Sequence, residues 1–359
     1  MATHPPTGTR TPAARGFTLP AEWEPHAATW LSWPNARGAS FPGPHTQAIL
    51  PTFHKLVAEL ADAGERVILN LSDPVERQAI ERALPGSLLN AISLELVPTN
   101  EPWCRDHGPT VLRRPADGCR LAVCWNYNAW GGKYPPWDLD AAANERMAAN
   151  AGIETCVKRD LIIEGGSLES NGAGCLMISE SSVVTQSRNP GRTRDEIASE
   201  LRDYTGADEI IWVRAELPGD DTDGHVDCFA RFAPGNGLLV VEPTPEQAGA
   251  LPALAKNAQR LRRLCGERGW TFLGLPLPDP VHDSGAGARE PGDRLPATYA
   301  NYYVANEAVL VPGFDDRRDA EAAAIIGEAH PGRRVVTLPA RDLIWGRGGF
   351  HCLTQSLPA

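Results

Sequence analysis

Four polar segments of the sequence contain side chains that could take part in catalysis. They place Asp106 in NEPWCRDHGPT (100–110), Glu164 in IIEGGSLESNGAG (162–174), His225 and Asp227 in GDDTDGHVDCFARF (219–232), and Cys352 in GRGGFHCLTQSLPA (346–359). A cysteine is the natural side chain best suited to nucleophilic attack at neutral pH, and a histidine oriented by a carboxylate can move protons. These residue types therefore indicate covalent catalysis, provided that the four segments converge.

Each of these residues also has an ordinary structural interpretation. Asp106 could cap a turn, and Glu164 could be a solvated strand end. His225 could be a satisfied core histidine, and Cys352 a small buried apolar residue. Taken together, the residues favour a functional site over a structural role, because three carboxylates are costly to bury together without a cation to pair with them. We therefore expect a site that binds a cation.

The type of cation decides the reaction. A planar guanidinium presents parallel N–H pairs that two carboxylates can accept, which an ammonium cannot match. A thiolate from Cys352 could attack its central carbon, while His225 protonates the departing ammonia and then activates water. The residues thus indicate hydrolysis of a guanidine through a covalent thiouronium.

The surrounding sequence repeats one order of elements, which is a hairpin, a helix and one more strand. Hairpin-like pairs are expected at 110–126, 167–178, 225–242 and 298–312, helices near 44–63, 139–151, 193–205, 246–268 and 317–328, and closing strands at 66–71, 154–158, 209–213, 271–275 and 334–338. Thr193 and Glu196 form the pattern of a capping box. The first unit is irregular, with HAATWLSWP as its one clear early strand and an extra helix at 73–84.

Five such units, each of roughly 60 residues, account for the ordered part of an α/β chain. If the units close on themselves, equivalent loops surround one axis and bring the polar segments together. An open α/β sheet is the alternative. Residues 1–16 lack periodicity and are expected to be a disordered tail, which leaves 17–359 as a single catalytic domain.

Composition narrows the range of partners. The chain has 359 residues with Lys+Arg 34 against Asp+Glu 45, a net charge of −11 that argues against nucleic acid or an anionic membrane and suits a small cationic substrate. No apolar run is long enough for a membrane span and no signal peptide is evident, so we expect a cytoplasmic protein. The eight cysteines form no CxxC pair, which gives neither a zinc ribbon nor a disulfide framework. A homodimer is compatible with these features, although the sequence leaves the oligomeric state open.

Seven collinear motifs carry a resemblance to a known family. In order they are WCRDHGP, NAWGGKY (128–134), EGGSLESNGAG, SRNP (187–190), DDTDGHVD, LPATYANYYVAN (295–306) and GGFHCLTQ, and they span nearly all of 17–359. The chain resembles the agmatine deiminase and bacterial peptidyl-arginine deiminase family of guanidino-group-modifying enzymes. The resemblance implies a fivefold pseudosymmetric α/β propeller and a site without metal or cofactor.

Matched motif by motif, the resemblance also implies the roles of individual residues. Cys352 would be the nucleophile and His225 the acid and base. Asp106 and Asp227 would anchor the guanidinium, and Glu164 would be the partner of both His225 and the guanidinium.

Three departures from the family border the expected substrate. The family's agmatine deiminases carry GGGNIHC where this chain reads GRGGFHC, so Arg347 replaces a glycine and Gly349 an asparagine. Their loop resembles NDAWMRDTGP, whereas here Glu101-Pro102 and Cys104 intervene and His107 replaces a threonine. The EGGS segment continues as LESNG instead of His-Val-Asp-Gly. These changes leave the five core residues intact and bear on which guanidine is used.

The expected activity is therefore hydrolysis of agmatine to N-carbamoylputrescine and ammonia, a reaction on the way to putrescine. Trp103 is expected to cover the methylene chain and Asp221 to contact the distal ammonium, whereas Arg347 could grip a carboxylate if it points inward. Deimination of a C-terminal peptidyl arginine or of another guanidine is the enzymatic alternative. A remote alternative is a zinc-binding protein that uses Cys104, His107, His225, Cys228, His351 and Cys352.

Overall fold

The computed structural model describes residues 10–214, 216–283 and 292–359. Within these ranges the strands form five small sheets, with the orders β16-β1-β2-β3, β4-β5-β6, β7-β8-β9, β10-β11-β12 and β13-β14-β15. The strands are β1 His26–Ser32, β2 Val67–Leu71, β3 Ile92–Leu96, β4 Thr110–Arg113, β5 Arg120–Asn126, β6 Glu154–Ile162, β7 Leu168–Ser170, β8 Cys175–Ser179, β9 Glu209–Val213, β10 Ala230–Ala233, β11 Gly237–Val241, β12 Thr271–Leu275, β13 Tyr303–Val304, β14 Ala308–Gly313, β15 Arg334–Pro339 and β16 Thr354–Pro358.

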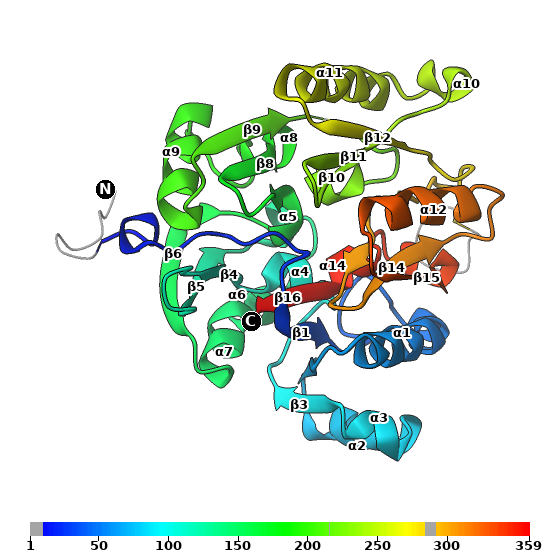
Figure 1. Cartoon of the computed structure of the whole chain (residues 1–359). Coiled ribbons are helices and arrows are strands. Elements are labelled where there is room, and N and C mark those ends of the chain that lie inside the picture. Colours follow the sequence, from blue (N-terminus) through cyan, green and yellow to red (C-terminus); the bar gives the residue numbers. More distant parts are fainter. Residues whose placement is uncertain (1–9, 215, 284–291) are drawn as a thin grey trace.

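The longer helices connect the strands within each sheet, and shorter ones lie in the loops (Figure 1). They are α1 Pro44–Asp62, α2 Pro74–Ala83, α3 Gly86–Leu89, α4 Cys104–His107, α5 Ala129–Gly132, α6 Asp138–Ala141, α7 Ala143–Asn150, α8 Glu180–Val183, α9 Arg194–Thr205, α10 Pro245–Ala248, α11 Pro252–Arg268, α12 Asp319–Ala329, α13 Arg341–Ile344 and α14 Phe350–Leu353. Short 3-10 helices are η1 Ala13–Arg15, η2 Gly165–Ser167 and η3 Val226–Cys228.

The predicted order of hairpin, helix and strand is confirmed in the last four sheets. In each, the first two strands pair antiparallel and the second pairs in parallel with the third. A helix makes the parallel connection, because parallel neighbours need a crossover. These helices are α7, α9, α11 and α12. The chain therefore has a mixed α/β fold built from similar units.

The first unit is completed by the far end of the chain. Strand β16 pairs antiparallel with β1, in a register that places Leu31 opposite Thr354. This strand was not predicted, because TQSLP lacks the alternation of apolar residues that marks a strand. β3 adds a fourth strand, parallel to β2. Pairing of β16 with β1 joins the two ends of the series of units.

Three predicted boundaries differ from the structure. The helix expected over 139–151 is two helices, α6 and α7, and the one over 246–268 is divided into α10 and α11. Pro252 begins α11, since a proline inside a helix would remove a backbone hydrogen bond. The tail expected over 1–16 is ordered in part, because η1 forms and Arg15 pairs with Glu154 at 2.7 Å. Residues 1–9 of that tail lie outside the described residues.

Short helical turns stand directly before the first strands of four antiparallel pairs. α4 precedes β4, η2 precedes β7, η3 precedes β10 and α14 precedes β16. α4 packs against η2 and α14, and η2 packs against η3. In Figure 1, α4 and α14 lie toward the middle of the molecule, among the sheets. The four polar segments of the sequence therefore meet. No helix within the described ranges is long and apolar enough to cross a membrane.

Candidate active site

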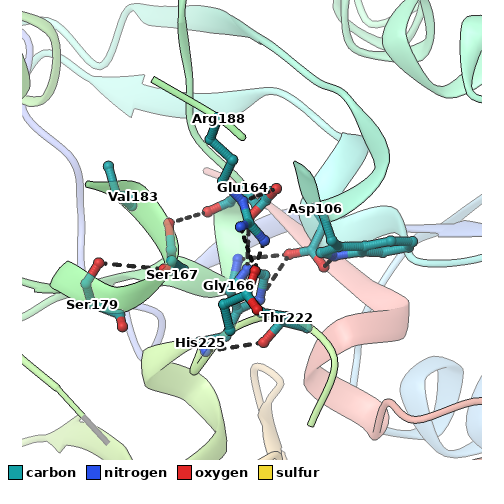
Figure 2. A network of polar contacts seen from close by, with 12 residues as sticks. Asp106, Glu164, Gly166, Ser167, Ser179, Val183, Arg188, Thr222 and His225 are labelled. Carbon is teal, nitrogen blue, oxygen red and sulfur yellow. Dashed lines mark hydrogen bonds and ion pairs between the residues drawn. The ribbon is translucent and has the colours of Figure 1, made fainter. Parts of the chain in front are cut away.

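His225 and Glu164 form a fully buried pair. The His225 Nε2 atom lies 2.9 Å from the Glu164 Oε2 atom, and neither side chain has measurable exposure. Arg188 binds the same carboxylate, with its Nε atom 2.7 Å from Oε1 and 2.9 Å from Oε2 (Figure 2). Glu164 is thus held between an imidazole and a guanidinium that belong to the protein itself.

Arg188 also ties this pair to the loop that precedes His225. Its Nη1 atom donates to Asp223 Oδ2 at 2.7 Å, and its Nη2 atom donates to the Thr222 carbonyl at 2.9 Å. The hydroxyl of Thr222 in turn accepts a hydrogen bond from the backbone N–H of His225 at 3.0 Å. Arg188 was missed as a functional residue, although the SRNP motif that contains it was recognised.

Asp106 is fixed by two neutral donors. The Gly166 N–H donates to Oδ1 at 2.9 Å, and the indole Nε1 of Trp130 donates to Oδ2 at 2.9 Å. The same Oδ1 lies 3.6 Å from Nδ1 of His225. Because both hydrogen-bond donors are neutral and the contact with His225 is longer than a hydrogen bond, the carboxylate can still pair with a further cation.

Cys352 lies in α14, beside the second aspartate. Its Sγ atom is 3.7 Å from Asp227 Oδ2, and that oxygen is also 2.7 Å from His351 Nδ1. The other ring nitrogen of His351, Nε2, is 2.9 Å from Glu22 Oε1. A buried chain of contacts therefore runs from the thiol through Asp227 and His351 to Glu22.

Glu22, at the end of this series of contacts, also binds two arginines. It accepts hydrogen bonds from Arg105 Nη2 at 2.6 Å and from Arg231 Nη2 at 2.7 Å. Burial alone would raise the pKa of Glu22, but Arg231, His351 and Arg105 hold it well below the ordinary value. The sequence suggested His351 only as a zinc ligand and did not single out Glu22, because their partners lie between 83 and 329 residues away in the chain.

The carboxyl groups of the site differ in the direction in which their pKa values are shifted. Burial would raise the pKa of Glu164, but Arg188 and His225 lower it below its ordinary value. Burial likewise opposes ionisation of Asp227, yet His351 and His225 bring its pKa down to about 2. Asp106 has a raised pKa, because burial and the neighbouring carboxylates outweigh the effect of His225. Asp106 is therefore the carboxylate with the most to gain from a bound cation.

His225 and Cys352 both hold protons at neutral pH. Burial would lower the pKa of His225, but Asp106, Glu164 and Asp227 together raise it to about 9. Burial and the charges of Asp227 and Asp106 raise the pKa of the Cys352 thiol well above 9. A cation bound beside Cys352 would favour the thiolate, since it offsets the two carboxylates.

Two of the five predicted catalytic residues, Asp106 and Cys352, form part of the wall of a small cavity. The cavity is lined by Ser40, Trp103, Asp106, Trp130, Tyr134, Asp221, Thr222, Gly346, Arg347, Gly348 and Cys352. Glu164, His225 and Asp227 lie behind this lining. The structure thus brings together all five predicted catalytic residues and the three predicted substrate-binding residues, Trp103, Asp221 and Arg347.

Arg347 lines the cavity, but its guanidinium is already engaged by the protein. Nη1 donates to the Gly219 carbonyl at 2.6 Å, Nε lies 3.9 Å from Asp221 Oδ2 and Nη2 lies 3.6 Å from Asp293 Oδ2. Asp221 also accepts a hydrogen bond from the hydroxyl of Tyr134. Close by, Gly348 contacts the ring of Trp103 so tightly that no side chain fits there, as expected for the glycine-rich segment.

The alternative zinc site is not formed. Among the described residues, no group of three His, Cys, Asp or Glu side chains is placed to hold a metal ion. His107 is instead buried with its Nε2 atom 3.1 Å from the hydroxyl of Ser32. Cys104 is also buried, and burial raises the pKa of its thiol to about 12.

Comparison with known proteins gives a consistent result. The family model for the Porphyromonas-type peptidyl-arginine deiminase matches residues 18–358. The agmatine deiminase of Ectopseudomonas mendocina is 32% identical over 98% of this chain and 98% of that protein. The agmatine deiminase of Pseudomonas aeruginosa is 33% identical, again over 98% of each. Among solved structures, the agmatine deiminase of Enterococcus faecalis superposes with a TM-score of 0.90 at 25% identity, covering 98% of both chains.

Proposed function

The chain belongs to the Porphyromonas-type peptidyl-arginine deiminase family, and from that premise we propose that it is an agmatine deiminase, which hydrolyses agmatine to N-carbamoylputrescine and ammonia. One observation carries the proposal. A cysteine and an aspartate, Cys352 and Asp106, share one small cavity, and the His225–Glu164 ion pair lies buried behind them. A nucleophile, an anion and a proton donor are thus gathered around a space that suits a small cation.

The first half of the reaction forms a bond to sulfur. The guanidinium of the substrate binds beside Asp106 and Asp227, and its charge favours the thiolate of Cys352. The Sγ atom attacks the central carbon, and His225 gives a proton to one terminal nitrogen. The bond from carbon to that nitrogen breaks, ammonia leaves, and a thiouronium on Cys352 remains.

The second half of the reaction consumes water. His225, now neutral, takes a proton from a water molecule that attacks the same carbon. The carbon–sulfur bond then breaks and the thiolate of Cys352 leaves. The hydroxyl on the carbon gives its proton to solvent, so the carbon keeps the oxygen as a neutral ureido group. Glu164 keeps His225 oriented throughout, as the partner carboxylate does in other acid–base pairs. Its further contact with the guanidinium remains a prediction, since Arg188 already occupies both of its oxygens.

The size of the cavity favours a small guanidine over a peptide. The cavity encloses little free space and is lined by the aromatic side chains of Trp103, Trp130 and Tyr134 beside Cys352, which suits a small guanidine better than a peptide chain. Agmatine fits this description, and Asp221 on the cavity wall provides a carboxylate for its distal ammonium. Arg347 on the same wall is the observation that favours a second candidate, a guanidine that carries a carboxylate.

The proposal extends to the architecture. The five units form a fivefold pseudosymmetric propeller, a conclusion supported by their repeated strand order and by the pairing of β16 with β1. The site lies where the turns that precede the units meet. We also propose that the protein is cytoplasmic and forms a homodimer.

The test is release of ammonia and of a ureido product from four guanidines: agmatine, free arginine, a peptide with C-terminal arginine, and guanidinobutyrate. Agmatine is expected to give the highest kcat/KM. Cys352→Ala should release neither product while still binding agmatine, because the carboxylates remain. Turnover by Cys352→Ala at the wild-type rate would rule out this cysteine as the nucleophile.

A further inference from the structure

The motif NAWGGKY (128–134) forms a loop whose backbone is under strain. Four successive residues have positive φ, namely Ala129 (50°), Trp130 (55°), Gly131 (85°) and Gly132 (84°). Residues with a β-carbon rarely adopt this conformation, and it persists only where the surroundings hold it. The indole of Trp130 donates to Asp106, as described above, but the mechanism uses none of the residues that follow it in the loop.

Lys133 and Tyr134, at the end of this loop, both contact the segment that precedes His225. The ammonium of Lys133 donates to the Asp221 carbonyl at 2.5 Å and to Asp223 Oδ1 at 2.7 Å. The hydroxyl of Tyr134 donates to Asp221 Oδ2. The main chain of Asp221 is therefore fixed by one residue of the loop, and its side chain by the next.

The contacted segment has a backbone conformation that needs such support. Asp223 has a φ of 66°, in the left-handed region that favours glycine. The two oxygens of its carboxylate have different partners, since Oδ1 accepts from Lys133 and Oδ2 accepts from Arg188 at 2.7 Å. Two cations thus hold Asp223 in place.

The two cations differ in burial and in what else they bind. The Arg188 side chain is fully buried and also binds Glu164, so it keeps the segment attached to the His225–Glu164 pair. The Lys133 side chain is 35% exposed and binds the main chain of Asp221. Loss of Lys133 should therefore release Asp221, while Arg188 keeps the catalytic pair in position.

We propose that Lys133 is a positioning residue that sets substrate preference, because it fixes the Asp221 carboxylate on the cavity wall where that carboxylate receives the distal ammonium of the substrate. Of the described residues, Tyr134 and Asp221 line the cavity and Lys133 does not, so Lys133 acts through Asp221. The proposal rests on the proposed function in taking this cavity as the guanidine site.

The charge of Lys133 would by itself have the opposite effect. A cation near the distal end of the cavity repels an ammonium, so its removal would lower KM for agmatine if charge were its whole contribution. Asp223 offsets that charge at 2.7 Å, and solvent screens what is left. Positioning therefore predicts that removal of Lys133 raises KM for agmatine.

Lys133→Ala and Lys133→Met both remove the ammonium, and Lys133→Met keeps most of the length of the side chain. Each should raise KM for agmatine about two- to fivefold with kcat changed by less than about twofold, since a partly exposed ion pair is lost and the catalytic pair is retained. For n-butylguanidine, which lacks the distal ammonium, KM should stay at the wild-type value. Lys133→Arg retains a cation and should return KM for agmatine toward that of wild type.

A double-mutant cycle with Asp221→Asn tests whether Lys133 acts through Asp221. Lys133→Ala should raise KM for agmatine little further once Asp221→Asn has removed the carboxylate, because both changes affect one interaction. Lys158→Ala is the matched control, since Lys158 is also paired with two carboxylates, Asp160 and Glu200, and none of the three lines the cavity. Its kinetic constants should equal those of wild type.

An unchanged or lower KM for agmatine in both Lys133→Ala and Lys133→Met would overturn the proposal. An equal rise in KM for n-butylguanidine, or a full effect of Lys133→Ala in the Asp221→Asn background, would also overturn it. Calorimetric titration of agmatine into Cys352→Ala, with and without Lys133→Ala, makes the same comparison without turnover. If wild type hydrolysed no guanidine, the proposed function would fail and this titration would decide the role of Lys133, whereas absence of agmatine binding would overturn both.

Discussion

A β-carbon on Gly166 would lie 2.6 Å from Nδ1 of His225, closer than two such atoms can approach. The same β-carbon would meet Asp106 Oδ1 at 2.9 Å and Asp227 Oδ2 at 3.0 Å. Three of the proposed catalytic side chains therefore converge over one glycine. The requirement for glycine is one of space, since Gly166 is not among the residues with positive φ.

The first prediction follows from this contact. Gly166→Ala should lower kcat/KM for agmatine at least about tenfold. The new methyl group would force His225 and Asp106 to move, and a displacement of catalytic groups by about 1 Å is enough to slow a reaction strongly. The fold should persist, which circular dichroism can verify. Gly86→Ala is the control, since a β-carbon there has no neighbour within 4 Å. Wild-type kinetics in Gly166→Ala would mean that the catalytic groups do not need their observed positions.

The second prediction concerns the two anchors. Asp106→Asn and Asp227→Asn each remove a negative charge from a buried cation site, a loss of about 2–5 kcal/mol by comparison with other truncated buried charge pairs. Each kcat/KM should therefore fall at least about tenfold. The exposed Asp62→Asn, at the end of α1, is the control and should be neutral. If either variant kept the wild-type kcat/KM, that aspartate would have only a structural role.

The third prediction concerns pH. Attack needs the Cys352 thiolate and release of ammonia needs the His225 imidazolium, so the active free enzyme carries one proton on this pair. The pKa of His225 is raised to about 9 and that of Cys352 lies well above 9. At neutral pH the pair therefore carries two protons, one more than the active form. The fraction of enzyme that has lost one proton increases with pH, so kcat/KM for agmatine should rise by about tenfold per pH unit toward pH 9. A profile that is flat between pH 6 and pH 8 would contradict this protonation scheme.

The pH dependence of folding stability provides a second test of the raised pKa of His225. The pKa of His225 rises from an ordinary 6.5 to about 9 on folding. Its imidazolium therefore stabilises the fold fully below pH 6.5, and this contribution is lost as the pH rises through 9. The difference in Tm between wild type and His225→Gln should be largest at low pH and shrink by pH 10. If the difference in Tm grew with pH, folding would lower the pKa of His225 instead of raising it, and the ion pairs around His225 would not stabilise its imidazolium.

The residues that the sequence identified share one property. Asp106 and Glu164 lie shortly before predicted hairpins, His225 lies at the first residue of another, and Cys352 lies in the last recognised motif, so the repeated unit order predicts that they meet. The structure places His225 just before η3 and β10 instead of within a strand. Packing then brings the loops together. Local patterns can predict such positions, because they depend on the order of elements and not on particular contacts.

Other features depend on contacts between distant parts of the chain, which no local pattern records. Glu22 meets Arg231 at 2.7 Å across 209 residues, and β16 completes the sheet of β1 from the other end of the chain. Arg188 was visible in its motif, but only the fold shows that its guanidinium holds Glu164. The direction of Arg347 was also undecided, because an arginine side chain can point into a cavity or away from it.

The last prediction concerns substrate choice. Arg347 lies on the cavity wall, but Asp221, Asp293 and the Gly219 carbonyl already surround its guanidinium. Because the Arg347 guanidinium is already engaged by the protein while the carboxylate of Asp221 lies on the cavity wall, we expect the site to accept an ammonium more readily than a carboxylate. Wild type should therefore have a higher kcat/KM for agmatine than for guanidinobutyrate, which replaces the ammonium by a carboxylate.

Two variants distinguish the causes of this preference. Asp221→Asn should raise KM for agmatine about two- to fivefold with little change in kcat, since a partly exposed ion pair contributes roughly 0.5–1 kcal/mol. Arg347→Ala removes the opposing cation, so it should strengthen the preference for agmatine. The opposite result, a wild type that prefers guanidinobutyrate and an Arg347→Ala variant that does not, would identify Arg347 as a carboxylate-binding residue. Deimination would then stand, but the natural substrate would be a guanidine that carries an acid, because Arg347 could form that contact only by leaving Asp221 for the substrate.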